Sequence, residues 1–359
     1  MENKSMYYGD YLGLDQILNS QNPVSFSPPN SPAHDEMLFI IIHQATELWF
    51  KQILFELDFV MGVFNKEKIN DNSEDLNLVR HRLIRIIRVQ ELLNQQISLL
   101  DTMTPLDFLE FRNLLSPSSG FQSVQFRLIE ARLGLQMEKR HEQSYYKRTN
   151  AGGFTQEDYE KVTQVEHKLT LLQQINRWLE RMPFFEKEYW DNFDKGHSEL
   201  HPFWHTYRKV YEEGLVEREK NKLADFDYVF FEKPLDSISE EQLKLLRSDL
   251  SPKAMRAALF IMLYRDFPVF QTSYQILDAL IEIDHKMSNW RHRHFIMVRR
   301  MIGMRVGTGN TSGSGYLEGA LSKHYVFKDI SGLSTYLIER KKLPHLPTEL
   351  ISKLSFASM

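Results

Sequence analysis

Apolar residues recur along most of this chain at spacings of three and four, the period of an α-helix. The segment from about Asn77 to Leu100 keeps this period with almost no helix-breaking residues. Strand-like alternation is rare, and no repeat of roughly 20 to 50 residues is visible. The pattern therefore predicts an all-α protein built around one main core.

Three helix starts carry recognisable N-terminal caps. In Thr104–Asp107 (TPLD), Thr takes the cap, Pro the first helical position, and Asp puts a carboxylate in the first turn. Ser251–Pro252 opens a second helix in the same way, which we expect to run as far as Phe267–Pro268. Thr155–Asp158 opens a third, which we expect to end near Arg181–Pro183.

The 359 residues suffice for one large or two ordinary domains. We expect a single domain over residues 1–359, in which the more polar stretch of about 184–250 forms a smaller, more variable helical excursion. Clusters of Gly and Ser at 116–120 and 307–315 lie between apolar segments, as functional loops do.

Composition excludes several classes of function. A net charge of -4 gives no support to nucleic-acid or anionic-membrane binding. The absence of cysteine excludes disulfides, thiolate metal sites and a cysteine nucleophile. The N-terminus is polar, and the longest apolar run, Met37–Ile42, falls far short of the roughly 20 residues that span a bilayer. We expect a soluble, cytoplasmic protein.

The segment Glu36–Leu57 is apolar on nearly every face, yet it contains His43 directly after Phe39–Ile42. Burying an imidazole there costs free energy unless a partner meets it. Two interpretations remain open. His43 is either a core histidine bonded to a backbone carbonyl, or a polar group that faces a ligand in an apolar pocket.

A second histidine lies on a regular apolar stripe in a helix expected from about Gln275 to Gly303. The stripe alternates spacings of four and three; its members are Ile276, Leu280, Ile283, Met287, Trp290, His294, Met297 and Met301. Positions i and i+2 point about 200° apart, so His294 faces inward and His292 outward. A single inward imidazole suits the axial position of a haem iron, although a hydrogen-bonded core histidine has the same spacing.

A competing metal site is His197-Ser-Glu-Leu-His201, whose i, i+4 spacing suits zinc. Pro202 breaks the helical pattern before His205, and the surroundings are polar and charged. We expect a surface turn there that binds metal only adventitiously.

Arg112 shares a helix face with Phe108, Phe111 and Leu115, and a buried guanidinium must be paired. It either forms an internal salt bridge or binds a ligand carboxylate through two parallel hydrogen bonds. The carboxylates available for a salt bridge are Glu47, Asp58, Glu110 and Glu130.

The loop 307–316 contains glycines that would let it close over a ligand and hydroxyl groups that would form hydrogen bonds to that ligand. Its composition is equally typical of a flexible linker.

Several long motifs occur together and in order: LFIIIHQATELWFKQ, TPLDFLEFRNLLSPSSGFQSVQFRLIE, RWLERMP, WRHRHFIMVRRMIG and GTGNTSGSGYL. With the early YYGDYL and the late LSTYLI, this set resembles the tryptophan 2,3-dioxygenase family. The resemblance covers Tyr8 to about Pro344 and is weakest over roughly 184–250. It implies an all-α, haem-dependent homotetramer with one haem b per subunit. Such an enzyme uses O₂ as co-substrate to open the indole ring of L-tryptophan at C2–C3, giving N-formyl-L-kynurenine.

The resemblance also implies roles for individual residues. His294 is expected to be the axial ligand of the haem iron, and His43 to bond the indole N–H as a positioning group. Arg112 is expected to bind the substrate carboxylate, and Thr308 its ammonium group. Phe108 stands where some members of the family carry Tyr, so apolar packing replaces a hydrogen bond there.

Further positions complete the implied site. The wall around the indole is expected to comprise Phe39, Ile40, Ile41 and Ile42. The residues expected to contact the cofactor are Trp290, Ser119, Gly120 and Tyr316. Tyr8 and Tyr11 match tyrosines that in this family reach the neighbouring subunit's pocket, so the site is expected to need the oligomer.

Three other functions remain open at this stage. A haem sensor without turnover is one, and a related haem enzyme acting on another indole is a second. Arg112 and Thr308 together favour a free α-amino acid over indole or tryptamine. A zinc hydrolase built on His197 and His201 is the third, and it would leave His43 and His294 without a joint purpose.

Overall fold

The computed structural model describes residues 6–69, 73–135, 153–185, 190, 201–233, 243, 246–305, 307 and 325–354. None of these residues lies in a strand, which confirms the all-α prediction. Among them, no helix is both long enough and apolar enough to cross a membrane.

The described helices fall into two groups along the chain. Those before residue 182 are α1 (Tyr8–Leu12), α2 (Leu14–Leu18), α3 (Glu36–Phe64), α4 (Glu74–Gln96), α5 (Pro105–Arg112), α6 (Val124–Leu133), α7 (Gln156–Glu166) and α8 (Leu171–Glu180). The later ones are α9 (Pro202–Gly214), α10 (Lys222–Phe231), α12 (Pro252–Leu263), α13 (Pro268–Ile302), α15 (Lys328–Gly332) and α16 (Thr348–Leu354).

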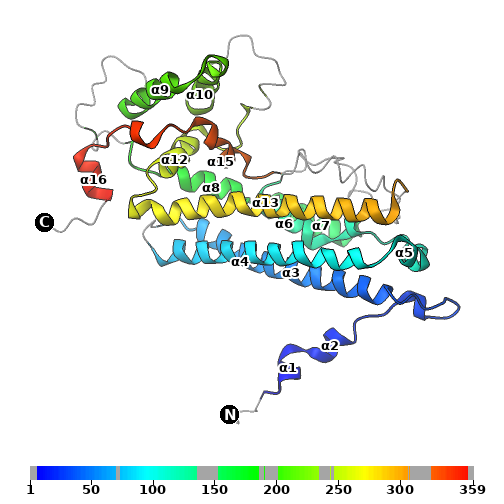
Figure 1. Cartoon of the computed structure of the whole chain (residues 1–359). Coiled ribbons are helices and arrows are strands. Elements are labelled where there is room, and N and C mark those ends of the chain that lie inside the picture. The colour runs from blue at the N-terminus through cyan, green and yellow to red at the C-terminus, as the bar shows by residue number, and fades with distance from the viewer. Residues whose placement is uncertain are drawn as a thin grey trace.

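Three long helices, α3, α4 and α13, run side by side and form the centre of the fold, with α4 packed against both of the others (Figure 1). The apolar stripe predicted on α13 is buried at Ile276, Leu280 and Ile283. This helix begins at Pro268, earlier than expected, because proline suits the first helical position. The periodic segment from Asn77 is α4, followed by a 3₁₀ segment over Ile97–Thr102.

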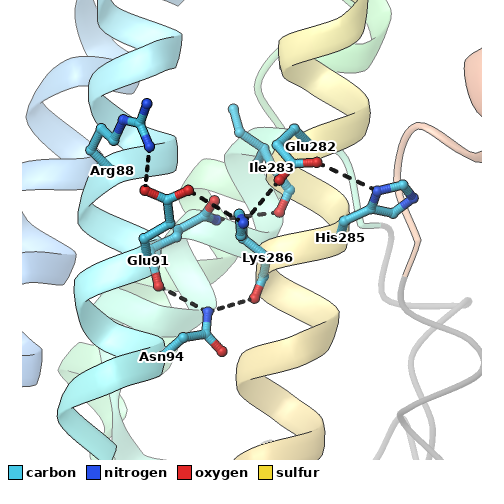
Figure 2. A network of polar contacts seen from close by, with 8 residues as sticks. Arg88, Glu91, Asn94, Glu282, Ile283, His285 and Lys286 are labelled. Atoms are coloured by element: carbon cyan, nitrogen blue, oxygen red, sulfur yellow. Dashed lines mark hydrogen bonds and ion pairs between the residues drawn. The ribbon is translucent and has the colours of Figure 1, made fainter.

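Polar side chains join α4 to α13 along their solvent edge (Figure 2). The ammonium of Lys286 lies 3.3 Å from Glu91 and 3.0 Å from Glu282. The amide of Asn94 donates to the carbonyl oxygens of Gln90 and Lys286, at 2.8 and 3.1 Å. Exposed ion pairs each contribute little to stability. We therefore infer that this network helps to set how α4 and α13 align along their length, rather than how stable they are.

The prediction of one helix from Thr155 to about Arg181 is wrong. The structure has two helices there, because Thr170 starts a new one. Its side chain accepts the backbone N–H of Gln173, and the Gln173 side chain accepts the N–H of Thr170. This reciprocal capping box satisfies two backbone donors and ends the earlier helix. The helix from Ser251 is also shorter than expected and ends at Leu263.

The described part of the more polar region, α9 and α10, is helical and lies beside α12 at one end of the molecule (Figure 1). Five of its aromatic side chains are fully buried in the main core: Phe203, Trp204, Tyr207, Phe226 and Phe230. The phenol of Tyr207 donates to the carbonyl oxygen of Tyr336 at 2.7 Å. Aromatic packing therefore attaches this region despite its polar composition. The single-domain organisation stays a prediction.

Candidate active site

A cavity of about 250 Å³ lies where α3, α5, α6 and α13 meet. Its wall is mostly apolar, with a few polar groups from different helices, which is the usual composition of a small-molecule site. It brings together these predicted site residues: Phe39, Ile42, His43, Phe108, Arg112, Ser119, Gly120, Trp290 and His294.

His294 enters the cavity from α13, whereas His292 is exposed on the other side of that helix. The structure thus confirms the predicted opposite directions of the two side chains. The imidazole of His294 stacks on the indole of Trp290, with ring centres 5.4 Å apart and planes 3° from parallel. Burial, aided by the nearby His43, lowers the pKa of His294 to about 4, so the ring is neutral near pH 7.

His43 enters from α3, and its Nδ1 lies 2.7 Å from the carbonyl oxygen of Phe39. A carbonyl oxygen only accepts, so Nδ1 carries the proton and Nε2 keeps a lone pair for a ligand donor. Burial lowers the pKa of His43, while the Phe39 hydrogen bond and the charge of Glu47 act in the opposite direction. His43 therefore bonds a backbone carbonyl, as the first interpretation predicts, and it also lines the cavity; that it faces a ligand there stays a prediction.

Arg112 lies at the end of α5, whose start is fixed by Thr104. The Thr104 hydroxyl accepts the backbone N–H of Asp107, and the Asp107 carboxylate accepts the backbone N–H of Thr104, as the predicted cap requires. Phe108 and Phe111 pack edge to face on the same helix, with centroids 5.4 Å apart, and Phe39 of α3 lies within 6 Å of both rings. The guanidinium group therefore borders an aromatic wall.

Comparison with known proteins identifies the family of this chain. Residues 1–337 match the sequence profile described as tryptophan 2,3-dioxygenase. The chain belongs to the tryptophan 2,3-dioxygenase family. The tryptophan 2,3-dioxygenase of Bdellovibrio bacteriovorus is 39% identical over 99% of each chain. That of Dictyostelium discoideum is 39% identical over 99% of this chain and 89% of the relative. Tryptophan 2,3-dioxygenase B of Danio rerio is 42% identical over 94% of this chain and 84% of the relative.

Some positions expected from the family resemblance do not line the cavity. Ile40 is absent from its wall, and Ile41 is 47% exposed, because a helix turns successive side chains away from the face that carries Phe39 and Ile42. Tyr8 and Tyr11 are 70% and 72% exposed on α1, which lies away from the main bundle (Figure 1). Thr308 and Tyr316, both predicted from the sequence, lie outside the described residues.

Three of the four carboxylates weighed as partners for Arg112 have other partners in the structure: Glu47, Asp58 and Glu130. Glu47 accepts from the hydroxyl of Ser123 at 2.5 Å and the amide of Gln125 at 2.8 Å. Asp58 pairs with Arg132 at 2.6 Å. Glu47 itself lines the cavity one helical turn after His43, and that spacing was the available sequence signal for it.

Glu130 pairs with Arg127 and with Arg291, and all three residues line the cavity. Sequence reasoning missed this cluster as part of the site. Arg127 lies one turn from Glu130 on α6, so their spacing is visible in the sequence. Arg291 lies on α13, so no local pattern predicts its contact with Glu130.

Of the two histidines in the zinc alternative, the structure describes His201, while His197 lies outside the described residues. The His201 ring packs against Trp190 with centroids 4.7 Å apart, its Nδ1 accepts the N–H of Phe203, and burial lowers its pKa to about 4. The expected polar surroundings are therefore wrong for this ring. Within the described ranges, no group of three or more His, Cys, Asp or Glu could hold a metal ion.

A second hollow, of about 500 Å³, lies on the surface between α4 and α13 and is lined by residues that include Glu91, Lys286 and His292. It is open to solvent, and Lys286 already bridges two carboxylates there (Figure 2). We assign no substrate site to it.

Proposed function

We propose that this chain opens the indole ring of L-tryptophan with O₂ in the cavity between His43 and His294, using haem b held by His294. The reaction is that of the family: both oxygen atoms are inserted across C2–C3, which gives N-formyl-L-kynurenine and begins tryptophan breakdown by the kynurenine pathway. The observation that carries the proposal is the convergence of His43, His294 and Arg112 on a single, mostly apolar cavity.

The residues of the cavity fit haem. A histidine that binds haem iron must be neutral, and burial lowers the pKa of His294 to about 4. Apolar and aromatic neighbours such as Phe50, Phe126 and Trp290 suit the flat face of a porphyrin. When bound, the haem iron supplies the redox centre that lets O₂ react with an indole. We propose Trp290, Ser119 and Gly120 as further contacts, and Tyr316 as predicted from the sequence.

The side chains of this chain would position the substrate at two ends. His43 keeps Nε2 as an acceptor for the indole N–H, because its Nδ1 proton is committed to Phe39. Arg112 offers parallel N–H donors to the carboxylate. Phe39, Ile42 and Phe108 would pack on the indole ring and exclude water. Fixing both ends of a small molecule turns random approach into a defined orientation, which lowers the barrier.

The remaining assignments rest on the family resemblance. Thr308 would bind the ammonium group, and Tyr8 and Tyr11 would complete the pocket of a neighbouring subunit in a homotetramer. Ile40 and Ile41 would extend the wall around the indole, as the resemblance implies. A cytoplasmic location is likewise retained as a proposal.

Purified protein, loaded with haem and reduced, tests the proposal when it is given L-tryptophan in air. We expect the near-ultraviolet absorbance of N-formylkynurenine to rise with the L-isomer. A normal ferrous haem spectrum with bound tryptophan but no product would instead support a haem sensor or a different substrate.

A further inference from the structure

The carboxylate of Glu130 is 1% exposed and lies at the contact between α6 and α13. Arg127 donates to one oxygen at 2.8 Å and Arg291 to the other at 2.9 Å. Both arginines are themselves buried, at 5% and 8% exposure. Removing one member of such a buried ionic cluster costs far more than removing a surface pair, so Glu130 fixes the two guanidinium groups firmly.

The cluster connects to His294 through a series of ring contacts. The guanidinium carbons of Arg127 and Arg291 lie 5.7 and 5.8 Å from the ring centre of Phe126. The Phe126 ring lies 5.2 Å from that of Trp290, which stacks on His294. Arg291 also follows Trp290 directly in the chain.

We propose that Glu130 is a positioning residue for the haem ligand. By holding Arg291 and Arg127 against Phe126, it fixes the Trp290 indole and through it the plane of the His294 imidazole. Groups that orient a metal ligand from behind determine how tightly and in what geometry the metal is held. The inference rests on the proposed role of His294 as axial ligand.

Glu56 supplies a matched control in the same chain. It is also 1% exposed, and it accepts from Arg85 at 2.8 Å and lies 3.5 Å from Arg82. It does not line the cavity. The arginine partners of Glu56 are more exposed than those of Glu130, so a purely structural role predicts only a larger loss of thermal stability at Glu130. Positioning of His294 predicts in addition a change at the haem that is specific to Glu130.

The test compares Glu130→Gln and Glu56→Gln in the haem-loaded, reduced full-length protein. Three quantities are measured: the thermal midpoint, the rate of haem transfer to excess apomyoglobin, and the iron–histidine stretching band in the resonance Raman spectrum. We expect both variants to melt lower. Only Glu130→Gln should lose haem about tenfold faster or more and show a shifted or broadened iron–histidine band.

Equal haem loss and an unchanged band in the two variants would overturn the inference. If Glu130→Gln does not fold, Arg291→Lys decides instead, because it keeps the charge but lacks the planar group that packs on Phe126. A band like that of the wild type in Arg291→Lys would then refute the idea. Failure of the proposed function is distinguishable, because the wild-type protein itself would lack an iron–imidazole band.

Discussion

Replacing Arg112 with Met tests whether the cavity recognises a free amino acid. The substitution removes the guanidinium but keeps an apolar stem of similar length beside Phe108. A hydrogen bond to a charged group contributes about 1.5–3 kcal/mol, and about 1.4 kcal/mol corresponds to a factor of ten. Because Arg112 is only half-buried, we expect L-tryptophan affinity to fall roughly ten- to hundredfold.

The assay is spectroscopic titration of the ferrous haem protein with L-tryptophan and, in parallel, with tryptamine, which lacks the carboxylate. The variant should lose affinity for L-tryptophan and keep its affinity for tryptamine. The fold should persist, since the cap at Thr104 and the fully buried Phe111 hold α5 in place. Equal losses for both ligands, or no loss with L-tryptophan, would refute the carboxylate-binding role.

Further predictions concern the two histidines and the fold. His294→Ala should abolish the five-coordinate ferrous spectrum and His292→Ala should leave it intact, because only His294 faces the cavity; the reverse result would contradict the helix-face argument. Protonation of His43 removes its acceptor, and burial lowers its pKa. Tryptophan affinity, measured against pH, should therefore hold through the ordinary histidine range near 6.5 and fall only below it; a fall centred at that value would contradict the burial. Phe111→Ala should lower the free energy of unfolding by about 3–5 kcal/mol in urea titrations, since this side chain is fully buried; a loss below about 1 kcal/mol would mean that the site repacks. Thr170→Ala should cost about 1 kcal/mol in the same assay by removing a helix cap, and no change would question the capping box.

Local patterns predicted the parts of the site that depend on helix geometry. The alternating spacing on α13 predicted that His294 faces inward and His292 outward. The cap residues Thr104–Asp107 predicted where α5 starts. Both follow from the helical period and from backbone donors at a helix end, which sequence alone determines.

Contacts between distant segments were beyond the sequence. The Glu130–Arg291 pair joins residues 161 positions apart, so nothing near either residue indicates it. The helix break at Thr170 was missed because the apolar period continues on both sides of the new cap. The surroundings of His201 were predicted wrongly because the residues just before it in the chain are polar. In the folded protein its ring packs instead against Phe185 and Trp190.

The most direct test of the central claim is a crystal structure of the ferrous haem protein with L-tryptophan bound. We predict iron bonded to His294, the indole N–H donating to Nε2 of His43, and the substrate carboxylate on Arg112. Iron held by another side chain, or tryptophan bound outside this cavity, would contradict it.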